Sequence, residues 1–170
     1  MSKKLPKPKA IVIDIEGTTT DRKFVSRTLF PMIRQKFKEF LTKTIDKSET
    51  KELIKSLEKL QKSGKYQGMP VIESAGRKES TIASVENNVQ WQLTSKLKTT
   101  ELKSAELLCW VWLYESGLLK SHVYDDVSDA LHEWKVRSGI KLYTYSSGMA
   151  CAQKLLFCNT VRGNLYPLVD

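Results

Sequence analysis

Two short segments of the sequence carry side chains that could act together on a phosphorylated compound. The first, Asp14-Ile15-Glu16-Gly17, ends an apolar run and is followed by three threonines. The second is Ser146-Ser147-Gly148, which follows the run IKLYTY. A carboxylate at a strand end can attack phosphorus as a nucleophile, and it can also ligate Mg²⁺, which prefers hard oxygen donors. The first segment therefore predicts a catalytic acid, and the second predicts an anion-binding turn.

The neighbouring residues have expected roles of their own. Glu16 could act as a proton donor and acceptor, or it could offer its backbone carbonyl to the metal ion. Gly17 permits a sharp turn, and Thr18–Thr20 provide hydroxyl and amide donors for an anion. Ser146–Gly148, just ahead of an expected helix, would form an anion-binding corner. The simpler alternative is that the acids are solvated loop residues and that the serines only cap a helix.

The elements that must position these residues are two strands. Residues 9–15 form a nearly continuous apolar run between Pro8 and Gly17, which predicts a strand covered on both faces in a parallel sheet. Residues 140–145 are rich in β-branched and aromatic side chains and predict a second strand. Loops at the carboxyl ends of parallel strands line the ligand crevice of an open α/β sheet. We therefore expect Asp14 and Ser146 to lie side by side.

Helices account for most of the remaining chain. Apolar residues recur every three or four positions, which predicts helices over residues 24–45 (bent at Pro31), 48–62, 77–93, 100–115, 125–137 and 149–157. The order of elements predicts one α/β domain interrupted by a helical insertion. The expected core domain comprises residues 1–23 and 118–170, and the expected insertion comprises residues 24–117.

The charge of the chain makes attraction to polyanions plausible, because 28 Lys and Arg residues stand against 19 Asp and Glu residues, a net charge of +9. However, many lysines lie in the basic start KKLPKPK or alternate with apolar residues at helix period, as in KELIKSLEKLQKSGK. This pattern favours solvated helix faces, so we expect no nucleic-acid partner. The only two histidines, His122 and His132, are expected to be surface or core residues.

The three cysteines have no paired spacing, which indicates reduced thiols in an intracellular protein. No apolar stretch reaches the length of a signal sequence or of a membrane span. We therefore expect a soluble protein that is not secreted.

Several motifs together resemble one known family. They are DIEGTTT at residues 14–20, FV and LFP at 24–25 and 29–31, NVQWQ at 88–92, KTTELK at 98–103, and YSSG with AQKLLF within 145–157. In this combination they resemble acireductone synthases, the bifunctional enolase-phosphatases of methionine salvage in the haloacid dehalogenase-like superfamily. The resemblance extends from about residue 9 to Asp170.

The resemblance implies an α/β fold with a haloacid dehalogenase-like, Rossmann-type core, incomplete here, and an inserted helical cap. It implies one Mg²⁺ per chain and a small phosphorylated diketone, 2,3-diketo-5-methylthiopentyl-1-phosphate, which is enolised and dephosphorylated to acireductone. Asp14 matches the nucleophile and metal ligand, Glu16 the acid/base residue and metal contact, and Ser146 and Ser147 the substrate-phosphate binders. The resemblance implies a monomer, although this shorter chain could associate. It also implies a location in the cytoplasm, with the nucleus as a further location.

The sequence also departs from the family pattern. The family continues beyond the position of Asp170, and that part carries a phosphate-neutralising lysine and an acidic metal-binding loop. Asp21-Arg22-Lys23 replaces the usual Pro-Ile-Ser, Asn164 replaces an aspartate, and Met149 replaces a small residue. We therefore expect weak Mg²⁺ binding and little phosphatase activity from these residues alone. The alternative function is a noncatalytic protein that binds a partner through its basic surface or an open sheet edge.

Overall fold

The computed structural model describes residues 6–170, so Lys3 and Lys4 of the basic start lie outside the described residues. The chain divides into two compact units. One consists of the chain up to Thr28 together with Leu119–Asp170, and the other is Leu29–Leu118. The assignment of residues 24–117 as a substrate-covering cap stays a prediction. Each unit is described by itself.

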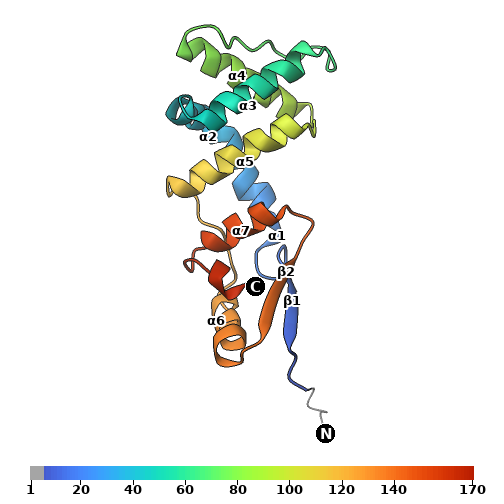
Figure 1. Ribbon diagram of the computed structural model, residues 1–170, viewed down its shortest axis with the longest axis vertical. Helices are drawn as coiled ribbons and strands as arrows, with labels where there is room; N and C mark the ends of the chain where they lie inside the picture. The colour runs from blue at the N-terminus through green and yellow to red at the C-terminus, as the bar shows by residue number, and fades with distance from the viewer. Residues whose placement is uncertain (1–5) are drawn as a thin grey trace. The chain divides into compact units, whose positions relative to one another are not determined.

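The sheet of the first unit is a parallel pair of strands, as the sequence predicts. Strand β1 (Ala10–Asp14) pairs with strand β2 (Lys141–Tyr145) so that Ala10 lies opposite Lys141 and Asp14 lies opposite Tyr145. The two strands lie side by side in Figure 1. This register places the carboxyl ends of both strands at the same end of the sheet.

The prediction that β1 is covered on both faces is wrong for the described residues. Burial alternates along the strand, because Ile13 is buried whereas Val12 is 66% exposed. On β2, Leu142 is fully buried whereas Tyr145 is 77% exposed. Alternate residues of a strand point to opposite faces, so one face carries the core and the other is open. An apolar run cannot by itself distinguish a strand buried on both faces from one buried on a single face.

Three of the later elements of the first unit supply side chains to the core on the buried face. After β1 come the short helix α1 (Arg22–Phe24) and the π-helical segment η1 (Val25–Leu29). The later elements are α6 (Val127–His132), the π-helical segment η2 (Glu133–Arg137), α7 (Ala150–Cys158) and the 3-10 helix η3 (Tyr166–Leu168). The buried core comprises Ile13, Ile15, Val123, Val127, Leu131, Ile140, Leu142, Leu156, Phe157, Leu165 and Leu168.

The second unit consists of four helices close to the predicted positions. They are α2 (Phe30–Thr44), α3 (Ser48–Lys62), α4 (Lys78–Thr94) and α5 (Thr100–Glu115). Pro31 is the second residue of α2 and follows the π-helical segment η1 directly. The predicted bend at Pro31 stays a prediction. Among the described residues, no helix is both long and apolar enough to cross a membrane.

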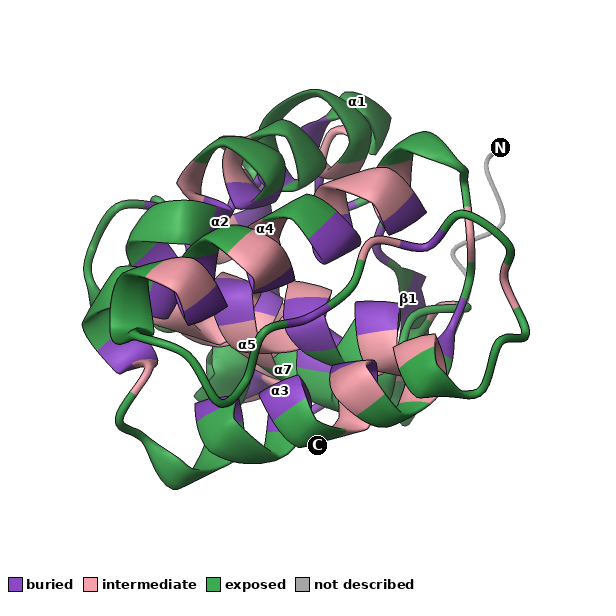
Figure 2. Cartoon of the chain, turned by 90° about the horizontal axis from the view of Figure 1, so that it is seen from above, coloured by how far each residue is buried: buried purple, intermediate pink, exposed green. Residues whose placement is uncertain are grey.

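The core of the second unit forms where α2 contacts α4 and α5, and α3 contacts α5. In Figure 2 the buried residues form purple bands along these helices, whereas green exposed residues occupy other sides. Aromatic rings fill part of this core, since the Phe37 and Phe40 rings lie 5.5 Å apart and the Phe40 and Trp112 rings 6.0 Å apart. Such tilted contacts are favourable arrangements for aromatic pairs.

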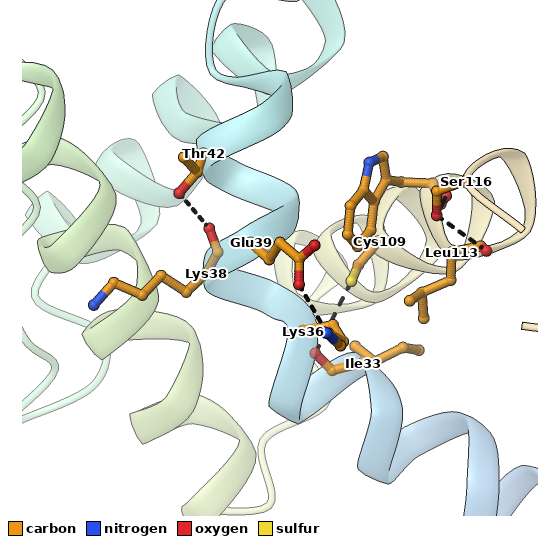
Figure 3. Close-up of polar contacts among 9 residues, drawn as sticks. Ile33, Lys36, Lys38, Glu39, Thr42, Cys109, Leu113 and Ser116 are labelled. Atoms are coloured by element: carbon orange, nitrogen blue, oxygen red, sulfur yellow. Dashed lines mark hydrogen bonds and ion pairs between the residues drawn. The ribbon is translucent and has the colours of Figure 1, made fainter. Parts of the chain in front are cut away.

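Cys109 illustrates how closely α2 and α5 pack. Its thiol is fully buried and donates to the Ile33 carbonyl of α2, with 3.9 Å between sulfur and oxygen (Figure 3). Burial raises the pKa of the Cys109 thiol to about 12, because the thiolate would lose its hydration. This cysteine therefore acts as a small apolar core residue rather than as a reactive group.

Candidate active site

Asp14 and Ser146 are brought together by the pairing of the two strands. Asp14 is the last residue of β1 and lies opposite Tyr145, the last residue of β2, so Ser146 follows directly beside it. The Asp14 side chain is exposed. Within the described residues, its carboxylate has no hydrogen bond or ion pair. An unpaired carboxylate at this edge is free to meet a ligand.

The loop that follows β1 is a tight turn built around one carbonyl. The amides of Thr18, Thr19 and Thr20 all donate to the Ile15 carbonyl, at 3.2, 3.0 and 2.9 Å. The Thr19 hydroxyl also donates to it, at 3.3 Å. The expectation that these amides serve an anion is therefore wrong, because the loop itself uses them. The Thr20 hydroxyl is buried and has no hydrogen-bond partner among the described residues.

The structure is compatible with both predicted roles of Glu16, as a proton donor and acceptor and as a backbone carbonyl for the metal ion. The turn is closed by neighbouring residues, since Gly17 N–H donates to the Thr20 carbonyl at 2.6 Å. The carbonyl oxygen of Glu16 accepts no hydrogen bond from any described residue, and its side chain is exposed. Gly17 takes a φ of +89°, which a residue with a side chain rarely adopts. The predicted sharp turn at this glycine is confirmed.

The serine turn after β2 is held by its own hydrogen bonds. Gly148 N–H donates to the Ser146 hydroxyl oxygen at 3.2 Å, so the Gly148 amide is not the free anion donor that the sequence suggested. Gln153 braces this turn, because its amide donates to the Gly148 carbonyl and its carbonyl accepts from Thr144, both at 2.8 Å. Ser147 is exposed and has no side-chain hydrogen bond in the described part of the chain.

The start of α7 supplies amides beside this turn. The first helical bonds run from Ala152 and Gln153 to the Met149 carbonyl, at 2.9 and 3.1 Å. The amides of Ala150 and Cys151 come before these bonds and therefore lack an intrahelical partner. Together with the Ser146 and Ser147 hydroxyls, these amides are donors that this strand end can offer to an anion.

His122 is a residue of this region that the sequence interpretation missed. Its Nδ1 accepts a hydrogen bond from Asp21 N–H at 3.1 Å, and its ring meets the Tyr124 ring edge-on at 5.0 Å. Tyr124 N–H in turn donates to the Thr19 carbonyl at 3.1 Å. Residues 122–124 therefore hold the loop that follows Asp14. A lone histidine outside any motif gives no signal of such a contact.

The oxygen atoms at the end of β1 fit a magnesium ion. The Asp14 carboxylate and the uncommitted Glu16 carbonyl are hard donors, and Mg²⁺ commonly binds through one or two protein oxygens while keeping several waters. Among the described residues, no group of three or more His, Cys, Asp or Glu side chains could hold a metal ion. The fit therefore rests on one carboxylate and one carbonyl.

Comparison with known proteins connects this geometry to a family. The chain is 42% identical over 162 residues to enolase-phosphatase E1 of Drosophila willistoni, covering 95% of this chain and 64% of that protein. It is 39% identical over 169 residues to enolase-phosphatase E1 of Xenopus tropicalis, covering 97% of this chain and 65% of that protein. The chain is therefore similar to enolase-phosphatase E1 proteins over nearly all of its own length. The family resemblance inferred from the sequence motifs is therefore confirmed.

A solved structure has a fold similar to that of this chain. The crystal structure of the UTR4 protein of Saccharomyces cerevisiae has a TM-score of 0.66 and 25% identity, covering 96% of this chain and 65% of that one. The predicted fold class, a haloacid dehalogenase-like α/β fold with a helical insertion, is thus confirmed. No family model matches the chain. The chain spans slightly less than two thirds of the length of these relatives.

Proposed function

We propose that this protein is a Mg²⁺-dependent enolase-phosphatase of methionine salvage. Its substrate would be 2,3-diketo-5-methylthiopentyl-1-phosphate, and its product would be acireductone. The observation that carries the proposal is the register of β1 and β2, which sets the free Asp14 carboxylate beside the serine turn. The names of the relatives favour this enzyme over a noncatalytic binding protein.

In the proposed dephosphorylation, Asp14 is the nucleophile. A carboxylate oxygen of Asp14 attacks phosphorus, and the bond from phosphorus to the substrate oxygen breaks, which leaves a phosphoryl group on Asp14. Glu16 gives its proton to the departing oxygen and afterwards takes a proton from the water that hydrolyses the acyl phosphate. The exposed position of both side chains suits these roles.

The phosphate oxygens would be held at the end of β2. Ser147 can donate its hydroxyl, and the free amides at the start of α7 can donate alongside it. Ser146 fixes the turn through its bond from Gly148 and can donate its own hydroxyl hydrogen to the phosphate. Held in this way, phosphorus would face Asp14 across the end of the sheet.

Asp14 and the Glu16 carbonyl are the groups that would hold Mg²⁺. When bound, the ion supplies positive charge that offsets the phosphate charge and polarises the carbonyl oxygen next to the carbon that loses a proton on enolisation. Because only one carboxylate takes part, we expect this chain to bind the ion weakly.

The test is phosphate release from the diketone phosphate with and without Mg²⁺, using this chain and its Asp14→Asn variant. We expect slow release that requires Mg²⁺, and a further loss of up to about a thousandfold in the variant, since the amide is a poor nucleophile. Asp129→Asn is the matched control, because Asp129 is an exposed acid on α6, away from the strand ends. This control should keep the wild-type rate.

Calorimetry provides a second measurement for the case in which turnover by this chain is slow. The diketone phosphate should then bind in the presence of Mg²⁺, and Asp14→Asn should weaken that binding while Asp129→Asn does not. If the folded protein shows no phosphate release and no Mg²⁺-dependent binding of the diketone phosphate, the proposal is overturned.

A further inference from the structure

One side of helix α3 carries a row of lysines. Lys51, Lys55 and Lys59 follow one another at intervals of four residues, which places them on the same side of the helix. All three are exposed, and none forms an ion pair with a described residue. Like charges four residues apart destabilise a helix. The row is therefore unfavourable unless negative charge faces it.

The acids of α3 do not neutralise this row. Glu49 and Glu52 line a separate hollow, which α3 forms with residues of α5. Glu58 is already paired with Lys62, and the carboxylate oxygen lies 2.6 Å from the lysine nitrogen. A solvated helix face usually mixes acids and lysines at a spacing of four residues. This helix instead separates its charges by side.

A groove runs along the lysine side of α3. Lys55 lines two hollows there, one of about 450 Å³ toward the end of the helix and one of about 270 Å³ toward its start. The segment that joins α3 to α4 runs back beside α3 (Figure 1), because Lys78 pairs with Asp46 at 2.8 Å near the start of α3. The two hollows together form a lysine groove between α3 and this segment.

The smaller hollow combines apolar and charged side chains. Ile54, which is 6% exposed, and the half-buried Ile45 line it together with the exposed Lys51, Lys55 and Lys78. The apolar side chains are the more buried ones, so they form the floor and the lysines form the rim. Such a hollow suits one apolar side chain that has negatively charged neighbours.

We propose that the lysine groove binds an acidic segment of another protein. Carboxylates of this segment pair with Lys51, Lys55 and Lys59, and one apolar side chain enters the hollow over Ile54. The lysines repeat at about 6 Å along the helix axis. Alternate residues of an extended chain repeat at about 6.6 to 6.8 Å, so an extended segment with an acid at every second residue matches the row. Complementary charges of this kind favour specific association.

Other occupants fit the groove less well. Neither an arginine nor an aromatic side chain is among the described residues that line it, whereas such side chains hold single-stranded nucleic acids by stacking. A groove walled on two sides does not match a flat membrane surface. A second copy of this chain carries the same net charge of +9 and would be repelled. The groove lies wholly within the second unit, so the inference does not depend on the proposed activity.

Fluorescence anisotropy tests the groove with a defined probe. The probe is a short fluorescein-labelled peptide in which Glu alternates with Gly and which ends in Leu. It should bind this chain at low salt and dissociate as the salt concentration rises. Replacing Lys51, Lys55 and Lys59 together by Gln should weaken the binding about tenfold, because each exposed ion pair contributes modestly.

A charge-matched control separates the groove from the overall positive charge. It replaces Lys9, Lys103 and Lys120 together by Gln, since these lysines are exposed, form no ion pair with described residues and lie outside both hollows. Its affinity for the probe should stay within about twofold of the wild-type value. Equal losses in the two triple variants, or no binding of the probe at low salt, would overturn the proposal.

Further probes identify the kind of partner. The peptide with Gly in place of Leu should bind more weakly, and the peptide with Gln in place of Glu should not bind. If single-stranded RNA or phosphatidylserine vesicles bind through the three lysines and the peptide does not, the proposal is overturned. If the triple variant is unfolded by circular dichroism, Lys55→Gln replaces it with Lys103→Gln as its control. Lys55→Gln should then weaken binding about twofold, because Lys55 lines both hollows.

Discussion

Gly17 is the residue on which the shape of the loop after β1 most depends. Its φ of +89° is strained for any residue with a side chain, and a Cβ there would lie 2.5 Å from Nε of Arg22. We expect Gly17→Ala to lower the free energy of unfolding by about 2 kcal/mol, because the arginine must move and the backbone strain remains. Urea denaturation measures this change.

Gly64→Ala separates strain from collision. Gly64 has a φ of +68°, but nothing lies within 4 Å of a Cβ built there. Its substitution should therefore cost only the backbone strain, about 1 kcal/mol. If the two alanine variants lose the same stability, then Arg22 accommodates the methyl group freely and the collision has no energetic weight.

The site residues differ in how far the sequence could predict them. The placement of Asp14 and Ser146 at neighbouring strand ends was predictable, because strand ends are visible in apolar runs and parallel pairing brings such ends together. The hydrogen bonds from the Thr18–Thr20 amides to the Ile15 carbonyl could not be predicted. The hydrogen bonds of a turn depend on backbone angles that residue types do not specify. The bond from Asp21 to His122 joins residues 101 positions apart. No local pattern encodes such a contact.

Helices α4 and α5 are joined by a buried polar network that links two of the family-like motifs. Gln92 donates to the Asn88 side-chain carbonyl at 2.8 Å and accepts from the Thr99 hydroxyl at 2.7 Å. Thr99 also caps α5 by accepting from Leu102 N–H at 3.0 Å, and Asn88 donates to the Pro70 carbonyl at 2.8 Å. Asn88 and Gln92 are fully buried. The network thus fixes the NVQWQ helix against the start of the KTTELK helix.

Replacing Gln92 should destabilise this unit strongly. Gln92→Met keeps the length of the side chain but leaves polar atoms of Asn88 and Thr99 buried without partners, so we expect a loss of about 3 kcal/mol. Gln90→Met is the control, because Gln90 lies on the same helix and donates to the Arg34 carbonyl in an exposed contact. It should lose about 1 kcal/mol or less. Thermal and urea unfolding would contradict this interpretation if both variants lost the same stability.

At the level of elements, periodicity predicted the helices well and the environment of the strands poorly. The helices of the second unit begin and end near the predicted residues because their apolar stripes follow the helical period. The open face of the sheet was not foreseen, since the exposed Val12 is as apolar as its buried neighbour Ile13. One apolar sequence pattern is therefore compatible with both environments of a strand.

The charge balance of the whole molecule makes it sensitive to acid. The chain already carries a net charge of +9 at pH 7, and protonation of its carboxylates adds further positive charge and repulsion. Several carboxyls are also held ionised by basic partners. Lys78 lowers the pKa of Asp46, and Lys62 lowers the pKa of Glu58. The pKa of Asp170 is lowered mainly by the hydrogen bond from Lys135 and next by the hydrogen bond from Leu142 N–H.

Asp170 allows this acid sensitivity to be tested at one residue. Because its pKa lies below the ordinary value of 3.8 in the folded protein, the unfolded chain binds the proton first as the pH falls. Its stabilising contribution is therefore complete above that ordinary value and is lost as the pH drops through the folded pKa. We expect Asp170→Asn to be less stable than the wild type at pH 7, and the difference should shrink as the pH falls below 3.8. Urea denaturation across this range measures it, with Asp129→Asn as the control that should follow the wild type. A difference that stays constant with pH would show that the ionised carboxylate is not what joins Asp170 to Lys135 and β2.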